Sequence, residues 1–470
     1  MDTKALRQKI LDLAIHGKLV PQDPNDEPAS VLLERIRAEK ERLIKEGKIK
    51  KGKKSAKTSD KPHYPFELPK GWVWTTIEDV CSKIGSGSTP KGSNYSKEGI
   101  PFFRSQNVYN SGIVMSDIKY ISDEIHQMMI GTEVVANDLL LNITGGSLGR
   151  CAVIPSNFEK GNVSQHVCIL RPIVIKPEFL HCFILSSFFA KSMKITGSGR
   201  EGLPKYNLEK MLLPLPPEQE QERIVAETKR LQSFVDELET SCENMTKLVA
   251  QVKSKVLDLA IHGKLVPQDP NDEPASELLK RINPKAEIIT DNGHYQKLPV
   301  GWTICRLKDI SKIVTGSTPS KSNRGYYGGI FPFFKPADLD AGRHVYKATE
   351  CLSDDGKKVS RVVPKGATAI CCIGTIGKVG YLMYEGATNQ QINCAIPSKV
   401  VDSVFLFYLC ASPLFNDKLN SESSAVTISI VNKSKIEAIS VPLPPLAEQK
   451  RIVSKIEEIF AQLEAIETAL

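Results

Sequence analysis

The sequence predicts an α+β fold in which two mixed α/β domains are separated by a long antiparallel two-helix coiled coil, arranged as a pseudo-two-fold, circular repeat. Three observations predict it. Apolar residues recur every seven residues over one long segment, two stretches of sequence occur twice around that segment, and two modules of similar size open with the same residues. Together they indicate one framework written twice along the chain.

The long segment runs from about Pro217 to Ile261. Its apolar residues form two rows on one helix face, which is the pattern of a helix that packs along its length on another helix. At about 1.5 Å per residue it would span roughly 65 Å, too long to be buried inside one domain. We therefore interpret it as a spacer helix rather than as an ordinary amphipathic core helix. The two rows are Ile224, Leu231, Leu238, Met245, Val252 and Leu259, and Thr228, Val235, Cys242, Val249 and Val256.

Two stretches around this helix are repeated. LDLAIHGKLVPQDPNDEPAS occurs at 11–30 and again at 257–276, and LPLPPEQEQERIV at 213–225 becomes VPLPPLAEQKRIV at 441–453. The heptads follow the second repeat, so the C-terminal helix should pack on the central one. The predicted seam of the spacer helices is Ile224, Leu231, Val235, Leu238, Met245, Val252, Ile452, Ile456, Ile459 and Leu463.

The two offsets, 246 and 228 residues, total 474 positions against a chain of 470. The last helix and the first would then jointly rebuild the central one with four positions missing, and both termini should lie close together. The predicted parts are 1–61, N-terminal helices and a lysine-rich linker; 62–212, module 1; 213–291, a central region with the spacer helix; 292–439, module 2; and 440–470, the C-terminal helix.

The first segment, Asp2 to His16, is predicted to be a helix that Gly17 ends. The PQDPNDEPAS loop then provides Ser30 as the N-cap of a second helix, Val31 to about Glu46. His16 recurs in the second copy of the repeat, and we expect both histidines to hydrogen-bond at a helix C-terminus rather than to act in catalysis.

Each module begins after a Leu-Pro-x-Gly-Trp entry, at Trp72 and again at Trp302. Alternating apolar residues predict short strands, and longer apolar stretches predict one helix in each module. The strands are near 74–77, 113–115 and 163–170 in module 1 and 359–363, 369–373 and 391–396 in module 2, and the helices are 177–193 and 403–419.

Composition indicates a soluble globular protein, with 41% hydrophobic and 25% charged residues. There is no signal peptide and no apolar run near 18 residues, so we expect a cytoplasmic chain with no membrane contact. The eleven cysteines include no CxxC pair and are expected to be reduced core thiols. Of the net charge of +8, +6 lies between Lys45 and Lys61, in a run typical of a solvated linker.

The motifs of catalysis are missing from the sequence. Gly197 to Gly202 fits GxGxxG but follows a predicted helix, whereas a dinucleotide site needs a strand there. Gly377-Lys378 resembles the end of a P-loop but lacks the first glycine and the magnesium-binding hydroxyl. Asp117 to Lys119 is a nuclease-like triplet without a second carboxylate to complete a metal site. We predict no catalytic residue, no metal site and no cofactor in this chain.

Polar residues in the loops are the positive evidence. Arginine and lysine can pair with guanine, asparagine and glutamine with adenine, and aspartate with cytosine, although any solvated loop has the same composition. The candidate DNA-binding residues are Lys91, Ser93, Asn94, Tyr95, Arg104, Gln106 and Asn107 in module 1, and Lys321, Asn323, Arg324, Tyr326, Tyr327, Lys335 and Asp338 in module 2.

With AIHGKLVPQDPNDEPAS and PLPPxxEQxRIV each present twice, and with GSTP and PFF opening each module, essentially the whole chain resembles the specificity subunits of type I restriction-modification enzymes. The resemblance implies two target-recognition domains, each reading one half of an asymmetric, bipartite site on double-stranded DNA. It also implies two modification subunits, which carry S-adenosylmethionine and methylate adenine, and restriction subunits, which use ATP and magnesium. One departure from many members is the N-terminal extension, 1–61.

A rigid spacer would fix the distance between two readers and so the number of unread base pairs between half-sites. Half-sites about one DNA turn apart, roughly 34 Å, would let both modules approach the major groove from one side. Two other hypotheses stay open on the sequence: an enzyme whose site is not apparent, and a coiled-coil scaffold with no nucleic-acid role.

Overall fold

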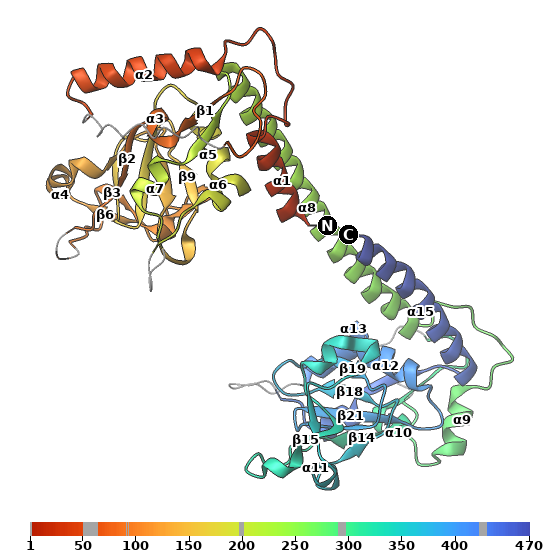
Figure 1. The fold of residues 1–470 in the computed structure, drawn as a ribbon. Helices are drawn as coiled ribbons and strands as arrows, with labels where there is room; N and C mark the ends of the chain where they lie inside the picture. Colours follow the sequence, from red (N-terminus) through yellow and green to blue (C-terminus); the bar gives the residue numbers. More distant parts are fainter. Residues whose placement is uncertain are drawn as a thin grey trace. The chain divides into compact units, whose positions relative to one another are not determined.

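The computed structural model describes residues 2–49, 64–90, 92, 94–196, 202–289, 298–422 and 430–470 (Figure 1). The chain divides into two compact units, Met1–Ser241 and Cys242–Leu470. The predicted spacer helix is confirmed as α8, Glu218–Ile261, a continuous helix of 44 residues whose first part belongs to unit 1 and whose last part belongs to unit 2. The expected proximity of the two termini concerns the relation between the units and stays a prediction.

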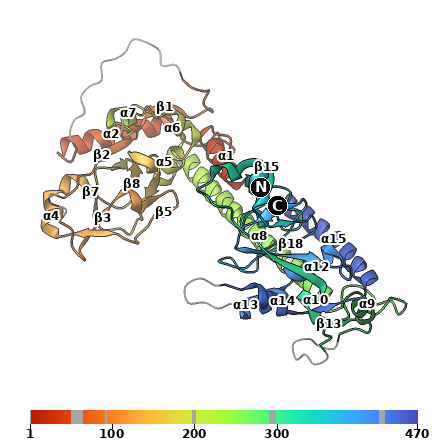
Figure 2. The ribbon, with the colours of Figure 1, turned by 90° about the horizontal axis from the view of Figure 1, so that it is seen from below.

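In unit 1, α1 (Thr3–Ile15) lies antiparallel along the first part of α8, as Figures 1 and 2 show. Arg7 forms ion pairs with Asp236 at 2.6 Å and with Glu239 at 2.8 Å. Gln22, which follows α1, donates to Glu220 near the start of α8. Arg7 in α1 thus contacts a later part of α8 than Gln22, which follows α1, and this is the direction of an antiparallel pair.

The second helix, α2 (Ala29–Lys45), begins earlier than predicted, and the expected cap at Ser30 is wrong. Pro28 is at the N-cap and offers no side-chain hydrogen bond. Instead the Ala29 amide donates to the carbonyl of Gly71 at 2.8 Å. The entry into module 1 therefore satisfies the first turn of α2 in place of a capping hydroxyl.

Module 1 contains two four-stranded sheets and two short strand pairs. One sheet is antiparallel; in the other, β3 and β10 are parallel. The first sheet has the order β2 (Cys81–Ser86), β11 (Val167–Pro172), β8 (Leu139–Asn142) and β9 (Cys151–Val153), and the second β6 (Lys119–Ile121), β3 (Ile100–Phe103), β10 (Gly161–Val163) and β7 (Glu133–Val134). The pairs are β1 (Val73–Thr76) with β12 (Leu212–Leu215) and β4 (Val108–Tyr109) with β5 (Gly112–Ile113).

Short helices complete module 1, and the predicted helix at 177–193 is broken in two. The Ser186 side chain accepts from the Phe189 amide at 3.2 Å and so caps a new helix within the apolar run. The helices are α3 (Ile77–Val80), α4 (Asp123–Met128), α5 (Pro177–Ile184), α6 (Ser187–Ser192) and α7 (Lys205–Glu209). Of the predicted strands, 163–170 is divided between β10 and β11, and 113–115 is shorter than expected.

Module 2 repeats these strand orders in unit 2. Where module 1 has β4 and β5, module 2 has the 3-10 segment η6 (Asp338–His344), which is kinked at Gly342. One sheet has the order β14 (Ser311–Thr315), β21 (Ile392–Pro397), β18 (Thr368–Cys371) and β19 (Val379–Tyr381), and the other β16 (Glu350–Leu352), β15 (Tyr327–Phe334), β20 (Gly386–Thr388) and β17 (Val362–Val363), while β13 (Thr303–Arg306) pairs with β22 (Ser440–Leu443).

The predicted helix at 403–419 is also broken, at Ser412, whose side chain accepts from the Phe415 amide at 3.3 Å. Pro413 follows at the first helical position, where its missing N–H costs nothing. The helices of unit 2 are α9 (Ala275–Ile282), α10 (Leu307–Ile310), α11 (Asp354–Lys358), α12 (Ser403–Ala411), α13 (Pro413–Ser421), α14 (Lys433–Ala438) and α15 (Leu446–Ala469). In unit 2, α15 lies antiparallel on the last part of α8, and Lys253 pairs with Glu467 at 2.7 Å.

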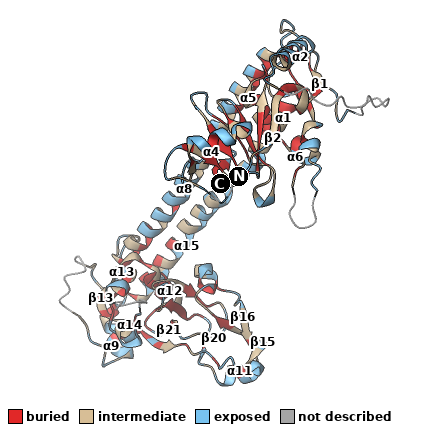
Figure 3. Cartoon of the chain, turned by 90° about the vertical axis from the view of Figure 1, so that its left-hand side faces the viewer, coloured by how far each residue is buried: buried red, intermediate tan, exposed pale blue. Residues whose placement is uncertain are grey.

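Each module has three layers, because its antiparallel sheet is covered on both faces. In β8, Leu139 and Leu141 point into the core shared with the helices, whereas Leu140 points into the core shared with the second sheet. This alternation is the two-residue period of a strand. Figure 3 shows buried residues concentrated in the sheets, while much of α8 and α15 is exposed.

Each module is attached to its helix through a buried glutamate at an equivalent position: Glu220 of α8 for module 1 and Glu448 of α15 for module 2. Glu220 accepts from Trp72 Nε1 at 2.9 Å and from Gln22 at 3.1 Å. In unit 2, Glu448 accepts from Trp302 Nε1 at 3.0 Å and from Gln268 at 3.1 Å. Burial raises the pKa of both carboxyl groups, because it disfavours the charged form. The repeated Trp and the repeated PQDP loop thus form one joint, built twice.

Most of the predicted seam residues are covered. Ile224, Val235, Ile452 and Ile456 are buried, and Leu231, Leu238, Val252, Ile459 and Leu463 are half-buried. Met245 departs from the prediction, because it is 40% exposed. It lies two turns before Lys253, whose partner Glu467 is already near the end of α15 at Ala469. The partner helix of unit 2 therefore ends before it reaches Met245.

The predicted absence of disulfides agrees with the structure: all eleven cysteines are free and nine are buried. His16 and His262 contact the helix carbonyls of Asp12 and Asp258 at 2.6 and 2.7 Å, as predicted. Among the helices that the structure describes, none is long and apolar enough to cross a membrane.

Candidate nucleic-acid interface

Four loops of module 1 meet at one end of its sheets. The Ser88 amide donates to the Val163 carbonyl at 3.1 Å, and the Ser164 amide to the Phe103 carbonyl at 2.9 Å. Asn142 donates to the carbonyl of Ser105 at 2.8 Å. These bonds join the loops after β2, β3, β8 and β10, so the loop end of module 1 is braced from within.

The GSTP landmark belongs to this bracing. A Cβ on Gly87 would collide with the carbonyl of Val163, and one on Gly316 with the carbonyl of Asn389. The Thr89 hydroxyl donates to Gln165 at 2.7 Å, and Thr318 makes the equivalent bond to Gln390. Glycine allows the backbones to approach, and threonine then joins the two loops in each module.

Arg104 and Gln106 converge on Asp117. Arg104 donates to the carbonyl and the carboxylate of Asp117 at 2.6 and 3.0 Å, and Gln106 donates to the same carboxylate at 2.6 Å. The hydrogen bond from Arg104 holds the pKa of Asp117 below its usual value. Asp117 also has a left-handed backbone, with φ of 57°. The nuclease-like triplet is thus an ion-paired loop, and Arg104 already has a carboxylate partner.

Asn107 and Asp338 were predicted to read bases, but both are buried and hydrogen-bonded to backbone. Asn107 accepts from the Arg104 amide and donates to the carbonyls of Val114 and Ser116. Asp338 accepts from the Lys335 amide at 2.7 Å and from the Thr349 amide at 2.9 Å. Buried polar groups need such partners, so both side chains brace the loop after the PFF strand, and their role in base reading stays a prediction.

In module 2, Lys335 pairs with Glu350 at 3.0 Å, and the Tyr327 hydroxyl donates to the carbonyl of Pro319 at 2.6 Å. Burial raises the pKa of Tyr327. The other candidates are exposed (Asn94, Gln106, Lys321, Asn323 and Arg324) or half-buried (Tyr95, Arg104, Tyr326, Tyr327 and Lys335), and Lys91 and Ser93 lie outside the described residues.

The sequence prediction missed Arg150 and Tyr109. The Arg150 guanidinium lies over the Tyr109 ring, 4.9 Å from its centroid, and Tyr109 is 38% exposed. Arg150 ends the GGSLGR loop, in which Gly145 and Gly149 have φ of 70° and 85°. In module 2 the equivalent Lys378 pairs with Asp340 at 2.5 Å. Two glycines before a basic residue, repeated between modules, were the available signal.

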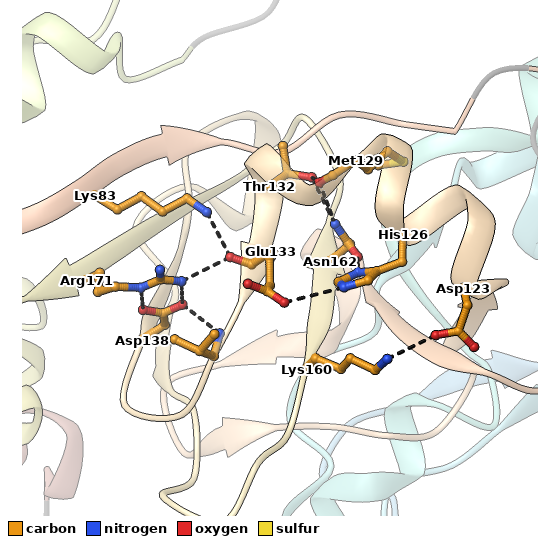
Figure 4. Close-up of polar contacts among 11 residues, drawn as sticks. Lys83, Asp123, His126, Met129, Thr132, Glu133, Asp138, Lys160, Asn162 and Arg171 are labelled. Carbon is orange, nitrogen blue, oxygen red and sulfur yellow. Dashed lines mark hydrogen bonds and ion pairs between the residues drawn. The ribbon is translucent and has the colours of Figure 1, made fainter. Parts of the chain in front are cut away.

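A polar network connects the two four-stranded sheets of module 1 (Figure 4). Arg171 forms two hydrogen bonds with the buried carboxylate of Asp138, at 2.7 and 2.8 Å. Lys83 donates to the carbonyl of Glu133 at 2.8 Å, and burial lowers its pKa. His126 contacts Asn162 at 2.6 Å. The Arg171 charge is paired with Asp138 and the Lys83 ammonium is hydrogen-bonded to a backbone carbonyl, so we interpret the network as structural rather than reactive.

Within the described ranges, no group of histidine, cysteine, aspartate and glutamate side chains is arranged to hold a metal ion. Lys378, in the P-loop-like sequence, forms an ion pair with Asp340. Residues 197–201 of the GxGxxG match lie outside the described part of the chain. What the structure presents in each module is a braced set of polar loops.

The sequence profile of the family described as "Type I restriction modification DNA specificity domain" matches residues 69–245 and 299–470. The chain is 30% identical to the type I restriction enzyme EcoAI specificity subunit of Escherichia coli, over 97% of this chain and 89% of that protein. It is 28% identical to the EcoEI specificity subunit of the same organism, over 99% and 90%.

A solved structure also shares the fold. The HsdS subunit from Thermoanaerobacter tengcongensis aligns with a TM-score of 0.55 at 22% identity, over 86% of this chain and 93% of that chain. With the profile matching both modules and the relatives matching nearly the whole length, this chain belongs to the family of type I restriction-modification specificity subunits, which carry two recognition domains.

Proposed function

We propose that this chain is the DNA-reading subunit of a type I restriction-modification complex. Module 1 reads one half of a bipartite, asymmetric site on double-stranded DNA and module 2 reads the other half. The spacer helices set the number of unread base pairs. The chain itself catalyses no step; adenine methylation and ATP-dependent cleavage belong to partner subunits, which hold S-adenosylmethionine, ATP and magnesium.

One observation carries the proposal: the two modules are attached to the helices by the same set of contacts, but their loop ends differ. The Glu220 and Glu448 joints repeat almost atom by atom, and the strand orders of the modules are the same. The loops differ, with β4 and β5 in module 1 and η6 in module 2. A repeated attachment with divergent loops is expected of a protein that reads two different sequences from one framework.

Partner subunits would dock on the helices. α8 carries exposed apolar side chains, among them Phe234 (54% exposed) in unit 1 and Leu248 (51% exposed) in unit 2. Aromatic and other large apolar side chains are enriched in the buried centre of protein–protein interfaces, so these two are candidates for contact with a partner. We assign two modification subunits to this framework, and restriction subunits to the complex that they form.

The test is DNA binding by the complex of this chain with its modification subunits. The site is first mapped from the methylated adenines of host DNA. Binding is then measured on matched duplexes, on duplexes with one half-site scrambled and on random duplexes, each across a salt series. The proposal predicts that scrambling either half-site abolishes specific binding. Only the non-specific, strongly salt-dependent binding to the DNA backbone should remain. Equal affinity for matched and random duplexes would refute it, and so would methylation by this chain without partners.

A further inference from the structure

Arg150 is a guanidinium without an acidic partner. Among the described residues, no Asp or Glu oxygen lies within ion-pairing distance of it, and its contact is the ring of Tyr109. The neighbouring cations are different. Arg104 and Lys119 share Asp117, at 3.0 and 3.6 Å. Among these three described cations, Arg150 is therefore the one that no carboxylate contacts.

The backbone around Arg150 is held rigidly. Its carbonyl accepts from the Asn142 amide at 2.8 Å, and the Gly149 amide donates to the Asn142 carbonyl at 2.9 Å. The next residue, Cys151, donates its amide to the Asn110 side chain at 3.1 Å, which ties the β8–β9 loop to the turn that carries Tyr109. Both members of the cation–π pair are thus fixed to one another.

At the equivalent position, module 2 has a different group. Lys378 occupies the equivalent place after Gly377, but its ammonium is neutralised by Asp340 of η6 at 2.5 Å. An ammonium is a point charge, whereas a guanidinium offers a flat fork of donors that matches two acceptors at once. The two modules therefore present different chemistry at the same position.

We propose that Arg150 is a base-reading residue of module 1 that contacts a guanine, and that Tyr109 is the residue that positions it. This inference rests on the proposed function. A guanine offers the O6 and N7 acceptors side by side in the major groove, and a bidentate arginine is the commonest contact to them. The exposed Tyr109 ring lies 4.9 Å from the guanidinium carbon, so this contact would hold the group in place before DNA arrives.

The experiment uses the complex with modification subunits and the mapped site. Each guanine in the half-site of module 1 is replaced in turn by 7-deazaguanine, which lacks the N7 acceptor. The unchanged protein should lose about 10- to 100-fold in affinity at one guanine. Arg150→Ala should lose a similar factor on natural DNA and should then be indifferent to 7-deazaguanine at that position.

Three variants sharpen the result. Arg150→Lys keeps the charge and should still lose the discrimination, because a point charge cannot reproduce the fork. Tyr109→Phe keeps the ring and should retain the discrimination, whereas Tyr109→Ala should lose part of it at the same guanine. Lys378→Ala, the matched variant of module 2, should leave every position of the module 1 half-site unchanged.

Other outcomes overturn the proposal. Uniform weakening on all sequences, with a salt slope reduced by about one, would make Arg150 a phosphate contact. A half-site with no guanine on either strand, or no effect of Arg150→Ala, would also reject it. If the unchanged complex fails to prefer its mapped site over random DNA, the failure lies with the proposed function instead.

Discussion

Modules 1 and 2 agree where they meet the helices and differ in their interiors and at their loop ends. At the joint, Arg223 contacts Asp26 at 2.5 Å in unit 1, and Arg451 contacts Asp272 at 2.6 Å in unit 2. Beyond the joint the strand orders still agree, but individual side chains differ. The difference indicates that attachment to a helix has been maintained in both copies, whereas each interior and each set of loops has changed separately.

The interiors show how far that change can go. Asp138 stands immediately before β8 and Arg171 is the fifth residue of β11; at the equivalent places in module 2 are Ala367 and Ile396. The same strand order therefore accommodates a buried ion pair or an apolar contact. A satisfied ion pair and a well-packed apolar group can have similar net stability, so the fold does not require either.

The largest expected effect is a change of recognised sequence. Replacing residues 62–212 or 292–439 by the equivalent region of a relative should change one half of the site and leave the other half and the spacing intact. The exchange keeps most of β12 and all of β22 with the helices, because LPL and VPL recur with the helix sequence. Mapping of methylated adenines measures the outcome; changes in both half-sites would show that the modules are not independent.

Breaking the ion pair of module 1 should be the next largest effect. Asp138→Ala leaves Arg171 without its carboxylate and should cost about 3 kcal/mol, the lower end for such pairs because the Arg171 side chain is 30% exposed. Adding Arg171→Ile, as in module 2, should recover much of that loss. Urea unfolding of the full chain, with hydrogen exchange in β8 and β11, measures both; exchange in β18 and β21 is the control. A double variant as unstable as the single one would reject the equivalence of the interiors.

A smaller effect on stability is expected from substitutions along the apolar rows of α8, and it should differ between buried and exposed positions. Val235 is 1% exposed, and Val235→Ala removes two buried methyl groups, which should cost about 1 to 2 kcal/mol. Met245→Ala, at the exposed position, should stay within about 0.5 kcal/mol of the unchanged protein. Thermal unfolding of the two variants compares them directly, and equal losses would place Met245 in a seam after all.

The smallest expected effect is the change in the pH dependence of stability when the buried glutamate of a joint is replaced. Because burial raises the pKa of Glu220 above its ordinary value of 4.5, the folded state binds the proton more tightly than the unfolded state. Its contribution to stability is therefore greatest below that value and declines as pH rises through the raised pKa, by at most about 1.4 kcal/mol per pH unit. Glu220→Gln should flatten this decline. Glu448→Gln should do the same in unit 2, and an unchanged slope in both would contradict the buried-carboxylate account.

Much of this architecture was predictable, because repeats and heptads are written directly in the sequence. The spacer helix was predicted at 217–261 and begins one residue later. The break at Ser412 could have been found from its serine and proline, a common helix start. The burial of Asn107 could not have been predicted, because loop composition does not distinguish a buried hydrogen-bonding side chain from an exposed one. Arg150 was missed because its partner Tyr109 is distant in sequence.

The central claim is that the helices fix the separation of two readers. The most direct measurement removes one heptad from α8 and a matching heptad from α15, which preserves the apolar rows and shortens the spacer by about 10 Å, or about three base pairs. The methylated adenines of a host carrying this variant are then mapped. The account predicts the same two half-sites with about three fewer unread base pairs between them. Methylation of the original site with its original spacing would contradict it.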